Sequence, residues 1–153
     1  MIDCVLFEPD IPQNTGTILR LGACFGVTVH IVHPSGFALS DRNLRRAGMD
    51  YLDRAILREH ADWPRFQAWA RDSGRRLVAL STRGTARLDA FSFRTDDLIL
   101  LGRESAGLPE AVLASAQAVV RIPIRAGNRS LNQAVAASIA VAEALRQTGQ
   151  LPP

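Results

Sequence analysis

Short apolar runs alternate with amphipathic stretches along most of the 153 residues of this chain. This alternation is typical of an α/β fold in which a mostly parallel sheet is flanked by helices. Asn14 and Ser130 are expected to cap the first and last helices, because short polar side chains accept hydrogen bonds there. The predicted strands are residues 2–7, 27–32, 76–81, 97–101 and 119–122, and the predicted helices are residues 14–25, 44–47, 61–72, 109–116 and 131–147.

The length and composition predict a single domain spanning residues 1–153. Hydrophobic residues make up 47% and charged residues 22% of the chain, which is enough apolar surface for a core. No apolar run approaches the roughly 18 residues of a membrane helix. Asp3, Glu8 and Asp10 make the N-terminus unlike a signal peptide. We therefore expect a cytoplasmic protein without membrane association.

Neither the cysteines nor the histidines have the spacing of metal ligands. Cys4 and Cys24 lie in apolar surroundings, so both are expected to be reduced thiols that act as small core residues. His30 and His33 lie at a predicted strand end, and His60 is remote from them in sequence. No metal site is expected from this pattern.

All 18 basic residues are arginine, and the formal net charge is +3. A basic balance is compatible with a polyanionic partner, although so small an excess does not establish one. The absence of lysine excludes Schiff-base chemistry and the phosphate-binding lysine of a P-loop. Two interpretations stay open for the arginine-rich segments, phosphate contacts or solvated surface; these segments are residues 42–46, 75–76 and 83–87.

Three loops hold residues that packing alone explains poorly. Residues 8–16 follow the first predicted strand and lead into Arg20. Residues 101–109 place Glu104 between two glycines, which allow backbone to approach a ligand closely. Residues 122–132 end at the mouth of the last predicted helix. Ligands of open α/β sheets bind beyond the carboxyl ends of strands, where such loops lie. Taken singly, the first and third loops are better explained as helix starts than as ligand sites, and the second is equally well explained as a turn between strand and helix.

These loops carry three motifs whose order and spacing resemble a known family. The motifs are Glu8-Pro9-x-Ile11-Pro12-x-Asn14-Thr15-Gly16-x-Ile18-x-Arg20-Leu21, Leu101-Gly102-x-Glu104-Ser105-x-Gly107-Leu108-Pro109, and Ile122-Pro123 followed by Arg129-Ser130-Leu131-Asn132 and Glu143-Ala144. They resemble the SPOUT class of RNA methyltransferases, and within it the small single-domain tRNA enzymes that methylate the ribose of the wobble nucleotide. Residues 34–37 and 44–51 match as well, so the resemblance covers nearly the whole chain.

The resemblance implies methyl transfer from S-adenosylmethionine to the ribose 2′-hydroxyl of cytidine or uridine 34 in tRNA. It also implies a deep trefoil knot near the C-terminus and a homodimer whose active site joins both subunits. Arg20 matches the arginine assigned to activating the 2′-hydroxyl. Asn14, Glu104 and Asn132 match the polar residues that surround that arginine in the family. The family positions that hold the cofactor are matched here by Leu80, Gly102, Ile122, Ser130 and Leu131.

The chemistry of arginine refines the role expected for Arg20. A guanidinium effectively never loses its proton in proteins, so it is a poor proton acceptor. It is well suited to orienting a hydroxyl and to stabilising the oxyanion that develops on it. We therefore expect Arg20 to act electrostatically, with the proton leaving to phosphate, carboxylate or water.

Several residues depart from the family pattern, and other functions remain open. Arg103, Ala106, Gln133, Val135 and Ala142 differ from the usual residues and bear on the substrate nucleotide more than on the reaction. One alternative is 2′-O-methylation at another tRNA or rRNA position, although such relatives usually carry an extra RNA-binding domain. Another is a non-catalytic RNA-binding module, which would not need the polar constellation. A third, a doubly wound nucleotide-binding protein, lacks its G-x-G-x-x-G fingerprint.

Overall fold

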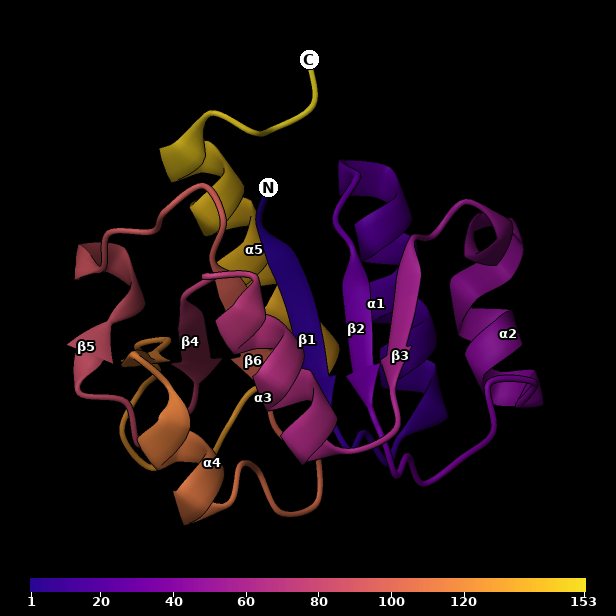
Figure 1. Ribbon diagram of the computed structural model, residues 1–153, viewed down its shortest axis with the longest axis horizontal. Helices are drawn as coiled ribbons and strands as arrows, with labels where there is room; N and C mark the ends of the chain where they lie inside the picture. Colours follow the sequence, from indigo (N-terminus) through magenta and orange to yellow (C-terminus); the bar gives the residue numbers. More distant parts are fainter.

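The computed structural model describes residues 1–153 and contains one sheet of seven parallel strands. The strand order is β3-β2-β1-β6-β4-β7-β5, so β1 and β6 lie at the centre (Figure 1). Cys4 in β1 lies opposite Val29 in β2 and Ile99 in β6. The strands are β1 (Asp3–Phe7), β2 (Val29–Val32), β3 (Leu57–His60), β4 (Leu77–Leu80), β5 (Ala86–Arg87), β6 (Leu98–Leu101) and β7 (Ala118–Arg121).

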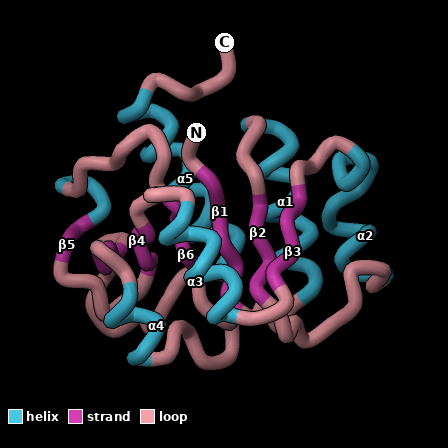
Figure 2. Tube along the Cα trace, viewed as in Figure 1, coloured by secondary structure: helices cyan, strands magenta, loops and turns pink.

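Helices cover both faces of this sheet, as Figures 1 and 2 show. Helices α3 and α4 lie in front of the sheet, and α1 and α5 lie behind it in both views. The helices are α1 (Pro12–Phe25), α2 (Arg42–Gly48), α3 (Trp63–Asp72), α4 (Glu110–Ser115) and α5 (Gln133–Thr148), with short 3-10 helices at Met49–Asp53 and Leu88–Ala90. The expectation of a mostly parallel sheet flanked by helices is confirmed. The trefoil knot stays a prediction.

Strand periodicity divides the core into two apolar layers. Cys4 and Leu6 point to the layer that contains Ile18 of α1 and Val141 of α5. Val5 and Phe7 alternate with them and point to the layer that contains α3 and α4. Successive side chains of a strand face opposite sides of a sheet, so central strands between two helical layers must be apolar throughout. None of the helices is long and apolar enough to cross a membrane.

Two strands and two helix caps differ from the sequence-based expectations. Strand β3 contains Leu-Arg-Glu-His and β5 has only two residues, so neither shows the apolar run that marked the other strands. The predicted cap at Asn14 is wrong, because α1 begins at Pro12 and its cap position, Ile11, has no side-chain hydrogen bond. The predicted cap at Ser130 is also wrong. Asn132 caps α5 instead and accepts hydrogen bonds from the backbone N–H groups of residues 134 and 135.

The structure also corrects the expectations for cysteine and histidine. Cys4 is buried, and burial raises the pKa of its thiol to about 12, whereas Cys24 is exposed and is not a core residue. His30 lies within β2 rather than at its end and is fully buried. Its Nδ1 atom lies 2.9 Å from Nε2 of His60, because β2 and β3 are neighbouring strands. The pKa of His60 is lowered, mainly by burial and further by the neighbouring His30.

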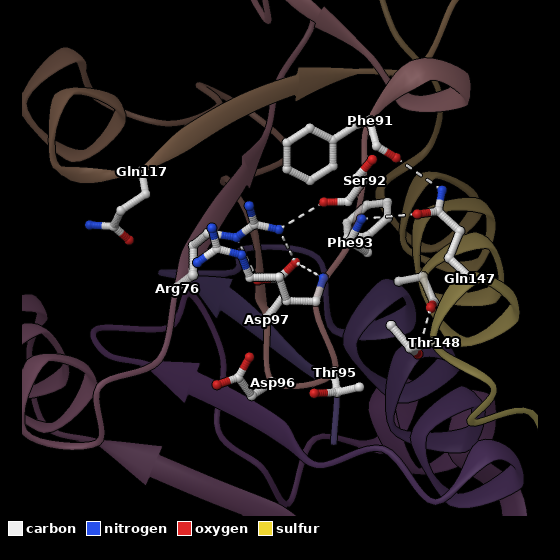
Figure 3. A network of polar contacts seen from close by, with 12 residues as sticks. Arg76, Phe91, Ser92, Phe93, Thr95, Asp96, Asp97, Gln117, Gln147 and Thr148 are labelled. Carbon is white, nitrogen blue, oxygen red and sulfur yellow. Dashed lines mark hydrogen bonds and ion pairs between the residues drawn. The ribbon is translucent and has the colours of Figure 1, made fainter.

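A network of polar contacts holds the loop before β6 (Figure 3). Arg76 donates to both carboxylate oxygens of Asp97, at 2.7 Å from Nε and 2.6 Å from Nη2. Asp97 is completely buried. Gln147 of α5 accepts a hydrogen bond from the backbone N–H of Phe93 and donates one to the carbonyl of Phe91, at 2.9 and 3.0 Å. These contacts tie the start of β6 to β4 and α5, and so help to place the loop that follows β6.

Candidate active site

The ends of three neighbouring strands open into a cleft of about 730 Å³, a size typical of small-molecule sites. Strands β6, β4 and β7 are adjacent in the sheet and parallel, so the loops that follow them meet at one edge. The first loop of the chain, after the central strand β1, contributes Ile11 and Asn14. Every predicted site residue except Arg20 lines the cleft: Asn14, Leu80, Gly102, Glu104, Ile122, Ser130, Leu131 and Asn132.

Three of these polar side chains form a continuous hydrogen-bonded network, one from each of the three motifs. Nδ2 of Asn132 donates to Oδ1 of Asn14 at 2.9 Å. Nδ2 of Asn14 donates to Oε1 of Glu104 at 3.2 Å. Asn14 is buried, and Asn132 is held by its capping bonds at the start of α5. The network therefore connects the first, second and third loops and holds their polar groups in fixed positions.

Asp10 is a site residue that the sequence reasoning missed. Its backbone N–H donates to Oε2 of Glu104 at 2.9 Å, and its Oδ1 accepts from the backbone N–H of Glu104 at 3.2 Å. The hydroxyl of Ser105 also donates to the Asp10 carboxylate. Asp10 lies inside the first motif at a variable position, so no motif signal marked it. Its reciprocal bonds with Glu104 make it a positioning residue for that carboxyl group.

The two carboxyl groups differ in their affinity for protons. Burial raises the pKa of Glu104, and its contact with Asp10 raises it further. The pKa of Asp10 is lowered, chiefly by its hydrogen bonding to Glu104. Glu104 therefore holds a proton more readily than Asp10 does, which makes it the candidate in this cleft for exchanging a proton with a ligand.

Close backbone contacts shape the second loop. A Cβ atom on Gly102 would lie 2.4 Å from the backbone carbon of Gly107, so only glycine fits there. Arg103 and Gly107 exchange two backbone hydrogen bonds, of 2.8 and 3.2 Å, and Gly107 has a φ of 68°. Nε2 of Gln133 donates to the carbonyl of Gly102 at 2.7 Å. Gln133, one of the departures from the family pattern, thus ties α5 to this loop.

Arg103, another of those departures, has a local partner in the first loop. Its Nη1 atom donates to Oε2 of Glu8 at 3.2 Å, and its Nε atom lies 3.8 Å from Oδ2 of Asp10. The arginine thus bridges the first two loops at the cleft. Ala106 also lines the cleft.

Arg20 does not line the cleft of its own chain. It is exposed on α1, with Nη1 3.0 Å from the sulfur of Met49 and the guanidinium 4.9 Å from the centre of the Tyr51 ring. Asn14 lies six residues earlier and faces a different side of the helix, because each residue turns an α-helix by about 100°. The structure thus brings Asn14, Glu104 and Asn132 together and leaves Arg20 apart from them.

The sequence model of the SpoU rRNA Methylase family matches residues 1–142. The chain belongs to this SpoU family. A Beijerinckia indica subsp. indica relative named tRNA (cytidine(34)-2′-O)-methyltransferase is 58% identical over 146 residues, which are 95% of this chain and 91% of the relative. The similarity to this relative therefore extends along almost the whole chain, well beyond the three motifs.

Solved structures of SpoU-like proteins share the fold. One, described as giving structural insights into the 2-OH methylation of C/U34 on tRNA, has a TM-score of 0.92 and 44% identity, covering 96% of this chain and 95% of that one. An AdoMet-bound rRNA methyltransferase from Sinorhizobium meliloti has a TM-score of 0.88 and 28% identity, covering 95% of this chain and 56% of that one. The SpoU fold of this chain thus corresponds to nearly all of the first protein and to about half of the second.

Proposed function

We propose that this chain transfers the methyl group of S-adenosylmethionine to the ribose 2′-hydroxyl of nucleotide 34, the wobble position, in tRNA. The observation that carries the proposal is the meeting of all three SpoU motifs in one cleft, with Asn14, Glu104 and Asn132 hydrogen-bonded together. The similarity to a protein named for methylation of cytidine 34 extends over 95% of the chain. The proposed unit is one domain of residues 1–153 acting in the cytoplasm, where a tRNA substrate is found.

The cleft suits S-adenosylmethionine in both size and chemistry. Leu80, Ile122 and Leu131 provide apolar surface for the adenosine, and Gly102 lets the backbone come close to it. Ser130 and the backbone groups of the second and third loops are available for its polar atoms. The cofactor supplies an electrophilic methyl group on a sulfonium. The AdoMet-bound relative of the same fold supports this assignment.

The position of Arg20 supports a homodimer with a shared active site. Within one chain Arg20 lies outside the cleft, so it can act on a bound ribose only where a second copy brings it to the neighbouring cleft. Exposed apolar side chains at the cleft and along α5 would be buried by such a partner. Ile11 and Leu131 lie at the cleft and are exposed by 42% and 38%, and Val135 and Ile139 of α5 are exposed by 48% and 39%.

The residues of this chain divide the work of the reaction between them. Arg20 orients the 2′-hydroxyl and stabilises the negative charge that develops on its oxygen. Glu104, whose pKa is raised by burial, is a candidate for receiving the hydroxyl proton. Asn14 and Asn132 hold Glu104 in place through the hydrogen-bonded network. Alignment of the hydroxyl with the methyl group then provides the main rate advantage.

The direct test is transfer of labelled methyl from S-adenosylmethionine to unmodified tRNA, followed by mapping of the labelled nucleotide. Label on the 2′-oxygen of nucleotide 34 is the expected result. Substrate tRNAs with cytidine or uridine at this position then define the base preference. Label at another tRNA position or only on rRNA would replace the wobble assignment with another RNA substrate. Cofactor binding without transfer to any RNA would contradict the enzymatic function.

Replacing Gly102 with alanine tests the cofactor cleft. We expect the Kd for S-adenosylmethionine to rise by at least tenfold, because the new methyl group meets backbone atoms of the second loop at 2.4 Å and displaces them. Binding is measured by calorimetry, with thermal unfolding as the check that the fold is retained. Gly74→Ala is a control for loss of stability without a change in the cleft: nothing lies within 4 Å of its Cβ position, but its φ of 67° makes alanine strained there. Unchanged affinity in Gly102→Ala would place the cofactor elsewhere.

A further inference from the structure

The sequence leaves two interpretations open for each arginine-rich segment, phosphate contact or solvated surface. The structure shows which of these arginines already have carboxylate partners. Arg75 and Arg76 are committed to the carboxylates of Asp3 and Asp97 inside the protein. The other two segments consist of more exposed side chains. They differ in whether those side chains already have carboxylate partners.

The segment at residues 83–87 is paired, and α2 is not. Arg83 binds Glu110 at 2.9 Å, and Arg87 binds Asp89 at 2.8 Å. The arginines of α2 are exposed and form no ion pair; they are Arg42, Arg45 and Arg46. Only this segment therefore offers guanidinium groups that are all available to an outside anion.

Helix geometry places these three arginines on one face of α2. Residues three and four apart share a face of a helix, so Arg42, Arg45 and Arg46 project together. Leu44 and Gly48 are buried on the opposite face, against α1. The approach is close, since a Cβ atom on Gly16 of α1 would lie 2.3 Å from the carbonyl oxygen of Leu44. Tight packing on α1 thus fixes the direction in which the arginines point.

The C-terminal end of α2, which carries this arginine face, lies close to Arg20. Helix α2 ends immediately before Met49, and the sulfur of Met49 contacts the guanidinium of Arg20 at 3.0 Å. The two carboxylates at the ends of α2 form no ion pair with these arginines. Asp41 accepts two backbone hydrogen bonds at the start of α2, and Asp50 lies beyond its end.

We propose that Arg42, Arg45 and Arg46 bind the phosphate backbone of the tRNA strand whose target ribose reaches Arg20. This inference rests on the proposed function and names the surface that docks its substrate. Arg42 and Arg46 are about 6 Å apart along the helix axis, from a rise of about 1.5 Å per residue. They can therefore contact successive phosphates of a strand that runs along α2. Guanidinium groups favour phosphate because their planar donors match its oxygens.

The test is the double variant Arg45→Ala/Arg46→Ala, assayed for tRNA binding over a range of salt concentrations. Each phosphate contact contributes roughly 0.7–0.9 to the slope of log affinity against log salt. We expect the slope to fall by about 1.5 and the KM for tRNA to rise roughly tenfold. The Kd for S-adenosylmethionine should not change, because neither residue lines the cleft. Arg45→Lys/Arg46→Lys should retain most of the salt dependence, since both charges remain.

The control is Arg65→Ala/Arg71→Ala in α3, which removes two exposed arginines, one paired with Asp62 and one unpaired, from the opposite side of the sheet. This control should bind tRNA as the wild type does. An unchanged slope and KM in Arg45→Ala/Arg46→Ala, with a wild-type enzyme that methylates tRNA, would overturn this inference alone. A wild-type enzyme that methylates no tRNA would instead contradict the proposed function. An equal loss in the α3 control would show that total charge, and not this face, binds RNA.

Discussion

Replacing Arg20 with alanine is expected to lower kcat for tRNA methylation by roughly 10²- to 10³-fold or more, the usual cost of losing one fixed donor to a developing oxyanion. The loss should appear in kcat rather than in cofactor affinity, because the proposed contact of Arg20 is with the ribose 2′-hydroxyl and not with the cofactor. Labelled methyl transfer at saturating tRNA measures the first quantity, and calorimetry with S-adenosylmethionine measures the second. Arg20→Lys should recover only part of the rate, since an ammonium lacks the planar, two-pronged donor geometry.

Mixed dimers show which cleft Arg20 serves. In a dimer of one Arg20→Ala subunit and one Glu104→Ala subunit, a shared site leaves one cleft with both wild-type residues. Activity should therefore reappear in the mixed dimer although each variant alone is inactive. If Arg20 served its own chain, neither cleft would be complete and no activity would return. That outcome would contradict the shared site.

The Asp97→Ala variant should lose about 3–5 kcal/mol of unfolding free energy, because it leaves the Arg76 guanidinium largely buried without its carboxylate. Asp97 is fully buried and accepts from Nε and Nη2 of Arg76 and from the backbone N–H of Arg94, so three hydrogen bonds are lost together. For a chain of this length the melting temperature should fall by roughly 10 °C. Equilibrium denaturation at fixed protein concentration measures the free energy.

Two further variants separate this network from charge removal in general. Asp89→Ala breaks an exposed ion pair with Arg87 and should have no measurable effect on stability. Arg76→Met/Asp97→Leu removes both charges and should be more stable than Asp97→Ala, because no buried charge is left unpaired. If Asp97→Ala unfolded at the wild-type denaturant concentration, the network would not hold the loop before β6.

The elements that were predicted from sequence are those in which local pattern and burial agree. The central strands β1 and β6 are apolar throughout because helices cover both of their faces. Strand β3 lies at an edge of the sheet and contains Leu57, Arg58, Glu59 and His60, so its pairing with β2 left no apolar run to detect. Short strands at an edge are defined by their backbone partner, and that partner is distant in sequence.

The helix caps and the buried side-chain pairs also depend on partners that are distant in sequence. Ser130 and Asn132 are both good capping residues, and only the folded loop decides that Asn132 bonds the first turn of α5. Asn14 was expected to cap α1, but it is buried and bonds Glu104 and Asn132 across the cleft. His30 and His60 are far apart in sequence and become neighbours through parallel strand pairing.

The sequence by itself determined the α/β class, the family resemblance and the residues that line the cleft, because these depend on residue types at fixed spacings. Tertiary structure alone decided that Asp10 positions Glu104 and that Arg20 lies apart from the cleft. It also decided that Arg76 is an internal residue while Arg45 faces solvent. An arginine in a sequence carries the same charge everywhere. Which carboxylates surround it depends on the packing of distant segments, and that packing separates the arginine of a structural ion pair from an unpaired arginine at the surface.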